Sequence, residues 1–327
     1  MKTIFLSHPH QLNKSDLLPT VMALGYFDGI HLGHQKVINT AKQIAKEKGY
    51  KCAVMTFDPH PSVVLGKKEQ HIQFITPLKA KEAIIAKMGI DYLYVVEFTP
   101  EFAELLPQQF VDQYLIDLHV KHVVAGFDFT YGRLGKGSME TLPFHSREEF
   151  THTVVPKLSY EEQKISSTYI RRLLKAGDVE QLPNLLGRFY EIEGVVVDGD
   201  KRGRQIGFPT ANISLIDDYL LPAIGVYAVK VRMKDYVYDG VCNVGYKPTF
   251  HEKREGRPNI EVHIFNFNQE IYGEKVTVQW YKHIRSEKKF SGVEQLVEQI
   301  QRDKEEAEAY FRNFNEKTCI LSRKDVF

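Results

Sequence analysis

The first half of the chain alternates short apolar runs with segments whose apolar residues recur every three or four positions. This rhythm is typical of βαβ units and predicts an α/β domain with an open, mainly parallel sheet. Gly49 and Gly89 mark helix ends, and Thr76 before Pro77 predicts a helix capped by the threonine. The predicted strands are TVMALG, KCAVMTF, DYLYVVEF, KHVVAGF and FTHTVVP.

The pattern changes near Pro183, where strand-like runs begin to follow one another over short turns. Five such runs predict a small antiparallel β-barrel. A last helix is predicted from Ser291, with Glu294 at the spacing of a capping box. We therefore expect two domains, residues 1–183 and 184–327. The predicted barrel strands are FYEIEGVVV, GVYAVKV, YVYDGVCNV, NIEVHIFNF and KVTVQWY.

Composition narrows the class of protein. The 43 Lys and Arg residues nearly balance 42 Asp and Glu residues, so the chain lacks the strong positive field of a nucleic-acid binder. The three cysteines are far apart and show no metal-site spacing. The N-terminal apolar run is interrupted by His and Pro, and no segment has the length of a membrane span. We expect a cytoplasmic protein without nucleic-acid or membrane partners; its oligomeric state is left open.

The segment GYFDGIHLGHQKVI leads from the first predicted strand into a helix. Its glycines allow close backbone approach, and His31 and His34 lie on one side of the helix start. Exposed N–H groups at a helix start favour a phosphate, and two imidazoles can donate to a phosphorus centre that gains charge. Capping or surface roles, or a zinc site that lacks a nearby third ligand, are the alternatives. The candidate residues are Gly25, Phe27, Asp28, Gly29, His31 and His34.

Three further segments of this half carry candidate residues. ISSTYIRRLL places hydroxyls and a guanidinium at a helix start, which suits a triphosphate but equally an ordinary capped helix. TFDPHP follows the second strand, and GFDFTYGRLGKG offers aromatic rings to a flat ligand or to the core. The candidates are Ser166, Ser167, Thr168 and Arg171 in the first segment, Asp58 and Pro59 in the second, and Phe129 and Tyr131 in the third.

The barrel half contains GDKRGRQIGFPTANI after its first predicted strand. Gly203 and Gly207 can form a flexible cradle of backbone N–H groups for a phosphate, although a glycine-rich hairpin with solvated charges fits the same residues. Pro209, Thr210 and Asn212 complete the motif G-x-x-x-G-F-P-T-A-N. Downstream, the chain continues with GVYAV, NVGYKPTF and EVHIFNF.

Taken together, these motifs resemble the prokaryotic bifunctional riboflavin kinase/FAD synthetase family along almost the whole chain. G-x-F-D-G-x-H-x-G-H is similar to the H-x-G-H nucleotidyltransferases, which implies a Rossmann-like adenylyltransferase domain with catalytic His31 and His34. S-S-T-x-x-R up to Arg171 then binds ATP phosphates, and the DPHP segment binds substrate. PTAN and EVHIF imply a riboflavin kinase in which Thr210 and Asn212 hold ATP-bound Mg²⁺.

The same resemblance assigns Glu261 as the catalytic base for the ribityl hydroxyl. It implies that riboflavin and ATP give FMN and ADP, and that FMN and ATP then give FAD and pyrophosphate. Two alternatives are weighed. A class I aminoacyl-tRNA synthetase shares the H-x-G-H helix start but leaves the barrel unexplained, and a flavin-binding regulator would bind flavin without consuming ATP.

Overall fold

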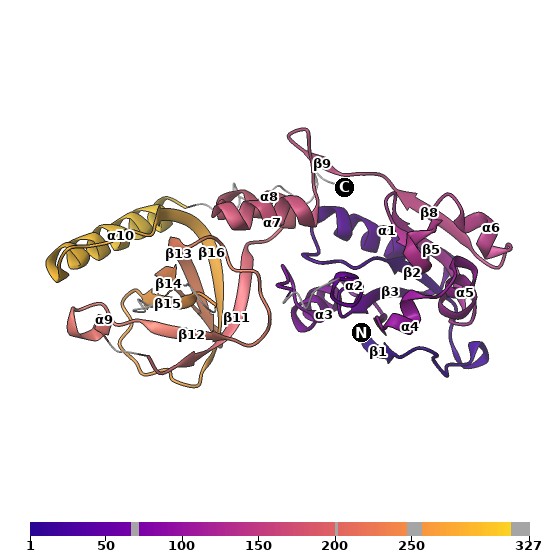
Figure 1. The fold of residues 1–327 in the computed structure, drawn as a ribbon, viewed down its shortest axis with the longest axis horizontal. Coiled ribbons are helices and arrows are strands. Elements are labelled where there is room, and N and C mark those ends of the chain that lie inside the picture. Colours follow the sequence, from indigo (N-terminus) through magenta and orange to yellow (C-terminus); the bar gives the residue numbers. More distant parts are fainter. Residues whose placement is uncertain (67–71, 200–201, 247–256, 315–327) are drawn as a thin grey trace. The chain divides into compact units, whose positions relative to one another are not determined.

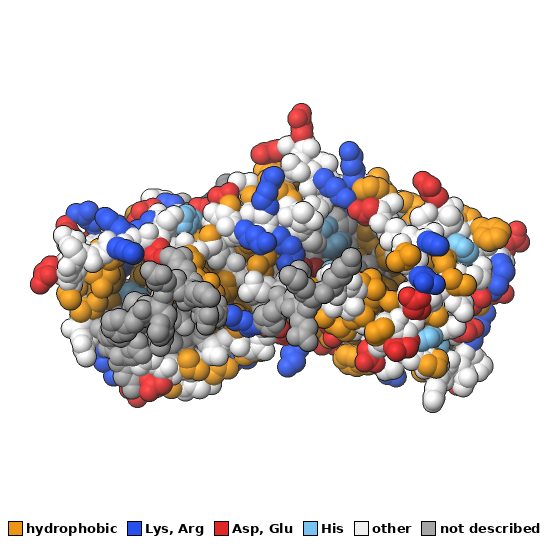
Figure 2. All heavy atoms as spheres, in the orientation of Figure 1, with side chains coloured by type: hydrophobic (Ala, Val, Ile, Leu, Met, Phe, Trp, Pro, Cys, Tyr) orange, Lys and Arg blue, Asp and Glu red, His pale blue; other side chains and the backbone are white. Residues whose placement is uncertain are grey.

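The computed structural model describes residues 1–327 apart from 67–71, 200–201, 247–256 and 315–327 (Figure 1). Within the described chain, two compact units are distinguished, residues 1–167 and 168–327. No helix in the described part is both long and apolar enough to cross a membrane. On the face shown in Figure 2, basic and acidic side chains are interspersed over both units, as the balanced charge predicts.

The first unit is built around strands that follow one another with intervening helices. Its elements are β1 Lys2–Leu6, η1 Lys14–Asp16, β2 Thr20–Leu24, α1 Leu32–Lys48, β3 Lys51–Asp58, α2 Pro61–Leu65, α3 Leu78–Lys87, β4 Tyr92–Glu97, α4 Pro100–Ala103, α5 Pro107–Val111, η2 Asp112–Ile116, β5 Val120–Gly126, β6 Thr130–Tyr131, η3 Arg133–Gly135, β7 Gly137–Ser138, α6 Leu142–Ser146, β8 Thr151–Val155, β9 Ser159–Tyr160 and β10 Gln163–Lys164.

The main sheet of this unit has six parallel strands in the order β1-β4-β3-β2-β5-β8. Residues of β2 alternate between two cores, because Met22 packs into the cluster on one face and Val21 into the cluster on the other. In the sheet, β3 pairs with β2 on one side, and β5, which comes later in the chain, pairs with β2 on the other side. The carboxyl end of β2 is therefore a switch point, where open parallel sheets bind ligands.

The five predicted strands of this unit are confirmed as β2, β3, β4, β5 and β8, but several local features differ from the prediction. Thr76 is not the cap of α3, whose N-cap is Pro77. The buried Thr76 N–H donates to the Asp28 carboxylate at 3.0 Å, a contact from a distant turn that the local pattern cannot reveal. The edge strand β1 was also not predicted. The helix break at Pro107 is confirmed, since this proline starts α5.

The second unit begins with short helices and continues as a barrel. Its elements are α7 Ser167–Ala176, η4 Val179–Gln181, α8 Leu182–Leu186, β11 Tyr190–Val197, α9 Arg202–Gln205, β12 Ala211–Leu215, β13 Gly225–Met233, β14 Tyr236–Gly245, β15 Asn259–Ile264, β16 Lys275–Ser286 and α10 Val293–Asn313. The strands close in the order β11-β12-β15-β14-β13-β16, every pair antiparallel. The predicted barrel is confirmed, with β12 as an additional strand inside the PTAN motif.

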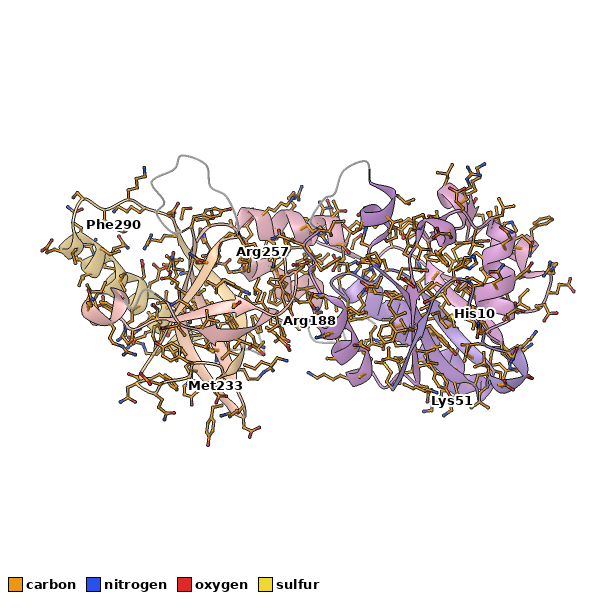
Figure 3. The ribbon with its side chains drawn as sticks, turned by 60° about the horizontal axis from the view of Figure 1, so that its bottom comes forward. His10, Lys51, Arg188, Met233, Arg257 and Phe290 are labelled. Carbon is orange, nitrogen blue, oxygen red and sulfur yellow. The ribbon has the colours of Figure 1, made fainter. Side chains whose placement is uncertain are left out.

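Helix α10 packs on the outside of the barrel. Its start differs from the prediction: Gly292 is the N-cap, and the Ser291 hydroxyl donates to the Gln295 side chain at 2.9 Å instead of forming a capping box. Arg285 on β16 donates to both carboxylate oxygens of the buried Asp303 at 2.8 to 3.0 Å, which fixes the helix to the sheet. Phe290, beside α10 in Figure 3, has its ring 5.8 Å from the Arg285 guanidinium.

Candidate active sites

The turn after β2 has a packed and unusual backbone. Phe27 and Gly29 have φ values of 57° and 87°, in the left-handed region. A Cβ on Gly25 would lie 2.8 Å from the Phe27 ring, so a larger residue would displace that ring. Asp28 is only 4% exposed and accepts the hydrogen bond from the Thr76 N–H. The turn therefore presents the start of α1 on a backbone that distant contacts hold in place.

His31 and His34 form one unit at this helix start. His31 is the N-cap of α1, and its Nδ1 accepts a hydrogen bond from the His34 N–H at 3.2 Å. The two rings stack with centroids 3.6 Å apart and 19° between their planes, and Phe27 meets the His34 ring edge-on at 5.3 Å. The pair lies at the positive end of a 17-residue helix. Among the described residues, no cluster of three His, Cys, Asp or Glu side chains is arranged to hold a metal ion.

Part of the S-S-T-x-x-R segment reaches the same turn. The Ser167 hydroxyl donates to the Asp28 carbonyl at 2.8 Å. Ser166 precedes it and is half-buried. Thr168 and Arg171 lie in α7, within the residues grouped with the second unit, so their approach to the histidines stays a prediction. The structure thus brings Ser167, 139 residues further along the chain, against the turn that carries the histidine motif.

The DPHP segment follows β3 and lies against the turn through aromatic contact. The rings of Tyr26 and His60 meet edge-on with centroids 4.2 Å apart. His60 also caps α2, because its Nδ1 accepts from the Ser62 N–H at 3.0 Å. Asp58 and Pro59 are half-buried at the end of the strand. The two segments predicted to bind different substrates are therefore neighbours.

An aromatic cavity of about 220 Å³ opens beside β3 and the loop after β4. Tyr131 lines it, and the Tyr131 hydroxyl shares a hydrogen bond of 2.7 Å with His145 Nδ1. Phe129 is not part of the lining; its ring lies behind Tyr131, with centroids 6.3 Å apart. The other aromatic lining residues are Phe57, Phe98, Phe102 and Phe110. These four phenylalanines come from four separate segments of the chain, so only the folded structure brings them together around the cavity.

Sequence reasoning missed Lys81 on α3, which is 3% exposed and lies under the same turn. Its ammonium donates to the Tyr26 carbonyl at 2.7 Å and to the Thr56 hydroxyl at 3.1 Å. Burial lowers the pKa of Lys81 to about 8, while Asp28 and Asp58 oppose that change. The available signal was its position four residues before Ile85, on the face of α3 that turns toward the core.

In the second unit, the glycine-rich loop closes on itself. The Phe208 N–H donates to the Gly203 carbonyl at 2.8 Å, and a Cβ on Gly203 would lie 2.2 Å from the Phe208 carbonyl oxygen. Gly207 has a φ of 84°. The Pro209 carbonyl accepts a hydrogen bond of 2.8 Å from His263 Nδ1 on β15. His263, which sequence reasoning also missed, thereby anchors the end of the loop to the barrel.

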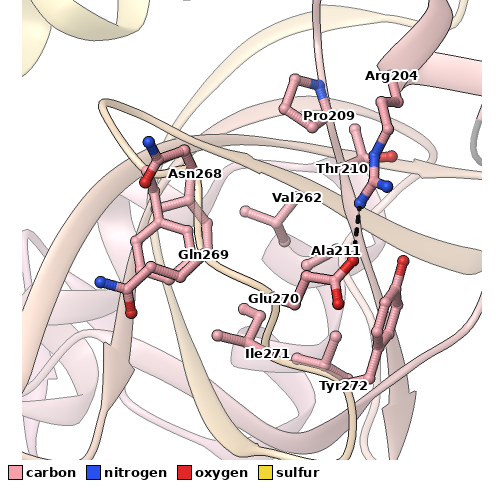
Figure 4. Close-up of a pocket in the computed structure, with 13 residues that line it drawn as sticks. Arg204, Pro209, Thr210, Ala211, Val262, Asn268, Gln269, Glu270, Ile271 and Tyr272 are labelled. Atoms are coloured by element: carbon pink, nitrogen blue, oxygen red, sulfur yellow. Dashed lines mark ion pairs between the residues drawn. The ribbon is translucent and has the colours of Figure 1, made fainter.

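Next to this loop lies a cavity of about 370 Å³ (Figure 4). Pro209 and Thr210 line one side of it, and the segment 267–272 lines the other. The Arg204 guanidinium lies 3.7 Å from the Glu270 carboxylate across the opening, as the dashed line shows. The cavity therefore combines the loop that was predicted to bind phosphate with a basic side chain.

Strand register places Asn212 and Glu261 directly opposite each other on β12 and β15. Asn243 on β14 is the partner of Glu261 on its other side. Directly paired residues lie on the same face of a sheet, so these three polar side chains form one row across three strands. Glu261 is half-buried. Residues 247–250 of NVGYKPTF lie outside the described residues.

Two family models match the chain in the order of its two units. The FAD synthetase model matches residues 13–169, and the riboflavin kinase model matches residues 186–311. The chain is therefore a transferase of flavin metabolism with two domains, which supports the parallel-sheet unit and the barrel unit as the places of its two activities.

Curated relatives cover nearly the whole chain. The bifunctional riboflavin kinase/FMN adenylyltransferase of Bacillus subtilis is 57% identical over 313 residues, covering 96% of this chain and 99% of that protein. The protein of the same name from Listeria monocytogenes is 50% identical, covering 95% and 98%. The chain belongs to the bifunctional riboflavin kinase/FMN adenylyltransferase family. This membership confirms the predicted enzyme class and decides against an aminoacyl-tRNA synthetase.

A solved structure also matches along the full length. The crystal structure titled macrolide-efflux protein from Streptococcus pneumoniae superposes with a TM-score of 0.84 at 36% identity, covering 96% of this chain and all of that one. Its title differs from the names of the curated relatives. The shared fold, rather than that title, is what the comparison contributes.

Proposed function

We propose that the turn after β2 carries the adenylyl transfer from ATP to FMN. An oxygen of the FMN phosphate attacks the α-phosphorus of ATP, the bond to the bridging oxygen breaks, and pyrophosphate leaves. His31 and His34 donate hydrogen bonds to the phosphate oxygens that gain charge, and Gly25, Phe27, Asp28 and Gly29 shape the nucleotide site. Ser166, Ser167, Thr168 and Arg171 bind the phosphates. The stacked histidine pair at the positive end of α1 is the observation that supports this assignment.

The aromatic cavity is the proposed site of the flavin ring. Five aromatic rings line it together with aliphatic side chains, which suits a flat heteroaromatic ligand that stacks or packs edge-on. Tyr131 contacts the ring directly in this proposal, while Phe129 supports Tyr131 from behind. Asp58 and Pro59 place the polar end of FMN near the turn, because the segment that contains them contacts Tyr26.

For the kinase, we propose that Glu261 takes the proton of the terminal ribityl hydroxyl. That oxygen then attacks the γ-phosphorus of ATP, and ADP leaves. Gly203, Gly207, Pro209, Thr210 and Asn212 bind the nucleotide beside the 370 Å³ cavity. The pairing of Asn212 with Glu261 across two strands supports the proposal, because it places a base next to a proposed nucleotide ligand.

We propose that magnesium binds together with ATP. The Thr210 hydroxyl and the Asn212 amide oxygen are hard, neutral donors of the kind that Mg²⁺ accepts when phosphates supply its other ligands. These residues therefore fit the ion. When bound, it would neutralise charge on the transferred phosphoryl group, while Glu261 remains available for the proton.

A cytoplasmic location and an absence of nucleic-acid or membrane partners belong to the same proposal. Cys52 and Cys242 are free and buried, which fits a reducing compartment. The near balance of 43 Lys and Arg against 42 Asp and Glu residues supports small-molecule substrates rather than a nucleic acid.

The assignment is tested by two variants in one assay of flavin products by chromatography. Glu261→Gln keeps the shape of the side chain but cannot accept the proton, so FMN formation from riboflavin should fall by about 100-fold or more. FAD formation from supplied FMN should persist in that variant.

The reciprocal variant, His31→Ala/His34→Ala, should lower FAD formation from FMN by about 100-fold or more, because each donor stabilises the transition state. Riboflavin phosphorylation in the same preparation should stay near the wild-type rate. If either folded variant keeps both activities, the residue roles are wrong; if either loses both, the two sites are not independent.

A further inference from the structure

Helix α3 has a lysine at a position that faces the core. Lys81 is 3% exposed, and Ile85, one turn later, is fully buried. Lysine is almost never this buried unless specific contacts compensate its charge. An aliphatic residue would fill the position without the desolvation cost of an ammonium. The charge therefore needs an explanation that packing alone does not supply.

The contacts of Lys81 join two loops. The ammonium donates to the Tyr26 carbonyl, in the turn after β2, and to the Thr56 hydroxyl, near the end of β3. The Thr56 hydroxyl donates to the same carbonyl at 2.8 Å. The Lys81 Nζ also lies 4.3 Å from the centroid of the Tyr26 ring, within cation–π range.

Two carboxylates interact electrostatically with the Lys81 ammonium. The negative charges of Asp28, in the turn after β2, and of Asp58, at the end of β3, both raise the pKa of Lys81 and so favour its charged form. The Tyr26 ring that covers the ammonium meets His60 on its edge. One buried positive charge thus interacts with two carboxylates at the turn where the proposed function brings two polyanionic substrates together.

We propose that Lys81 is a positioning residue of the adenylyl-transfer site, which holds the turn after β2 against the DPHP segment and offsets the charges of Asp28 and Asp58. This inference rests on the proposed function of that turn. Lys81 contacts neither substrate; it acts through Tyr26 and Thr56. The two substrates concerned are a nucleoside triphosphate and a phosphomonoester. Their phosphates repel each other, and they also repel the carboxylates of Asp28 and Asp58.

The pH dependence separates this role from a merely structural one. The pKa of Lys81 in the folded protein is about 8, below the value of about 10.4 in an unfolded chain. Between these values the unfolded chain binds more protons, so the contribution of Lys81 makes the fold more stable as pH rises. The rate of adenylyl transfer should fall as pH rises, because the neutral amine no longer offsets the charges of the two carboxylates.

The test compares three variants of the full chain. Lys81→Met keeps an unbranched apolar stem and removes the charged ammonium, and we expect kcat for FAD formation to fall about 10- to 100-fold, as for a misplaced reactive group. KM for ATP should change less, and the melting temperature at pH 7 should not fall. Lys81→Arg should restore most of kcat and move the alkaline loss of activity to higher pH. Lys79→Met, an exposed lysine of the same helix, is the matched control.

The inference is overturned if folded Lys81→Met keeps wild-type kcat, or if the alkaline limb is unchanged in Lys81→Arg. Should Lys81→Met not fold, the pH profiles of the wild type and Lys81→Arg still decide. Riboflavin phosphorylation measured alongside reports the integrity of the second unit. The proposed function has a separate failure: His31→Ala/His34→Ala would then retain FAD formation, whatever the result at Lys81.

Discussion

The two units support their candidate sites in different ways. In the first unit, polar groups beneath the site are buried: Asp28 and His31 are 4% and 6% exposed, and Lys81 is 3% exposed. In the second unit, the glycine-rich loop closes mainly through its own backbone, and Thr210 is exposed. Substitutions that leave a buried group of the first site without its hydrogen-bond partner should therefore lower stability and activity together, whereas substitutions in the loop should mainly lower activity.

The largest expected effect concerns where the second unit begins. The Leu174 carbonyl accepts from the Ala223 N–H at 2.9 Å, and the Glu180 carboxylate accepts from the His283 N–H at 3.1 Å. Leu182 and Leu186 are fully buried. A fragment 188–327 loses these contacts, and each buried leucine is worth about 1.5 to 3 kcal/mol.

We therefore expect fragment 168–327 to form FMN and to melt more than about 10 °C above fragment 188–327. Circular dichroism and the chromatographic assay measure both properties. Equal melting temperatures would support the boundary at 183/184 that the sequence predicts and would remove α7 and α8 from the support of the barrel.

An intermediate effect is expected at the buried turn. Asp28→Ala leaves the buried Thr76 N–H without its acceptor, which costs about 1 to 3 kcal/mol of unfolding free energy. FAD formation should fall in the same variant while riboflavin phosphorylation persists. Asp117→Ala, at an exposed site of the same unit, serves as the control for denaturant melts. Loss of activity without any loss of stability would contradict the coupling proposed for this unit.

The smallest effect on stability is expected in the glycine-rich loop. Gly203→Ala forces a Cβ against the Phe208 carbonyl, so the loop must shift, and kinase kcat/KM should fall by about tenfold or more. Gly203 is half-buried in a loop rather than in the barrel core, so the melting temperature should fall less than in Asp28→Ala.

Gly207→Ala is the comparison variant for this loop. It meets open space but keeps a φ of 84°, a strain of about 1 to 2 kcal/mol. Its kinase activity should fall less than that of Gly203→Ala. Equal losses would show that the flexibility of the loop, rather than its packing, controls the reaction.

Local sequence patterns determined much of the fold of this protein and the position of its histidine motif. The alternation of apolar runs and helical segments depends on contacts between near neighbours, so the parallel sheet, the barrel and the histidine pair at a helix start were predictable. The same motifs were sufficient to identify the family. The predicted cap of α3 was wrong by one residue, because Pro77 rather than Thr76 is its N-cap.

Tertiary structure alone decided which side chains meet. The contact of Ser167 with the Asp28 carbonyl and the pairing of Asn212 with Glu261 join residues that are 139 and 49 positions apart (261 − 212). In the sequence, Lys81 looks like any lysine of an amphipathic helix. Its ammonium is buried only because α3 packs against the turn after β2. Strand register and helix docking are set by the whole core, whereas sequence periodicity reports only which face of each element is apolar.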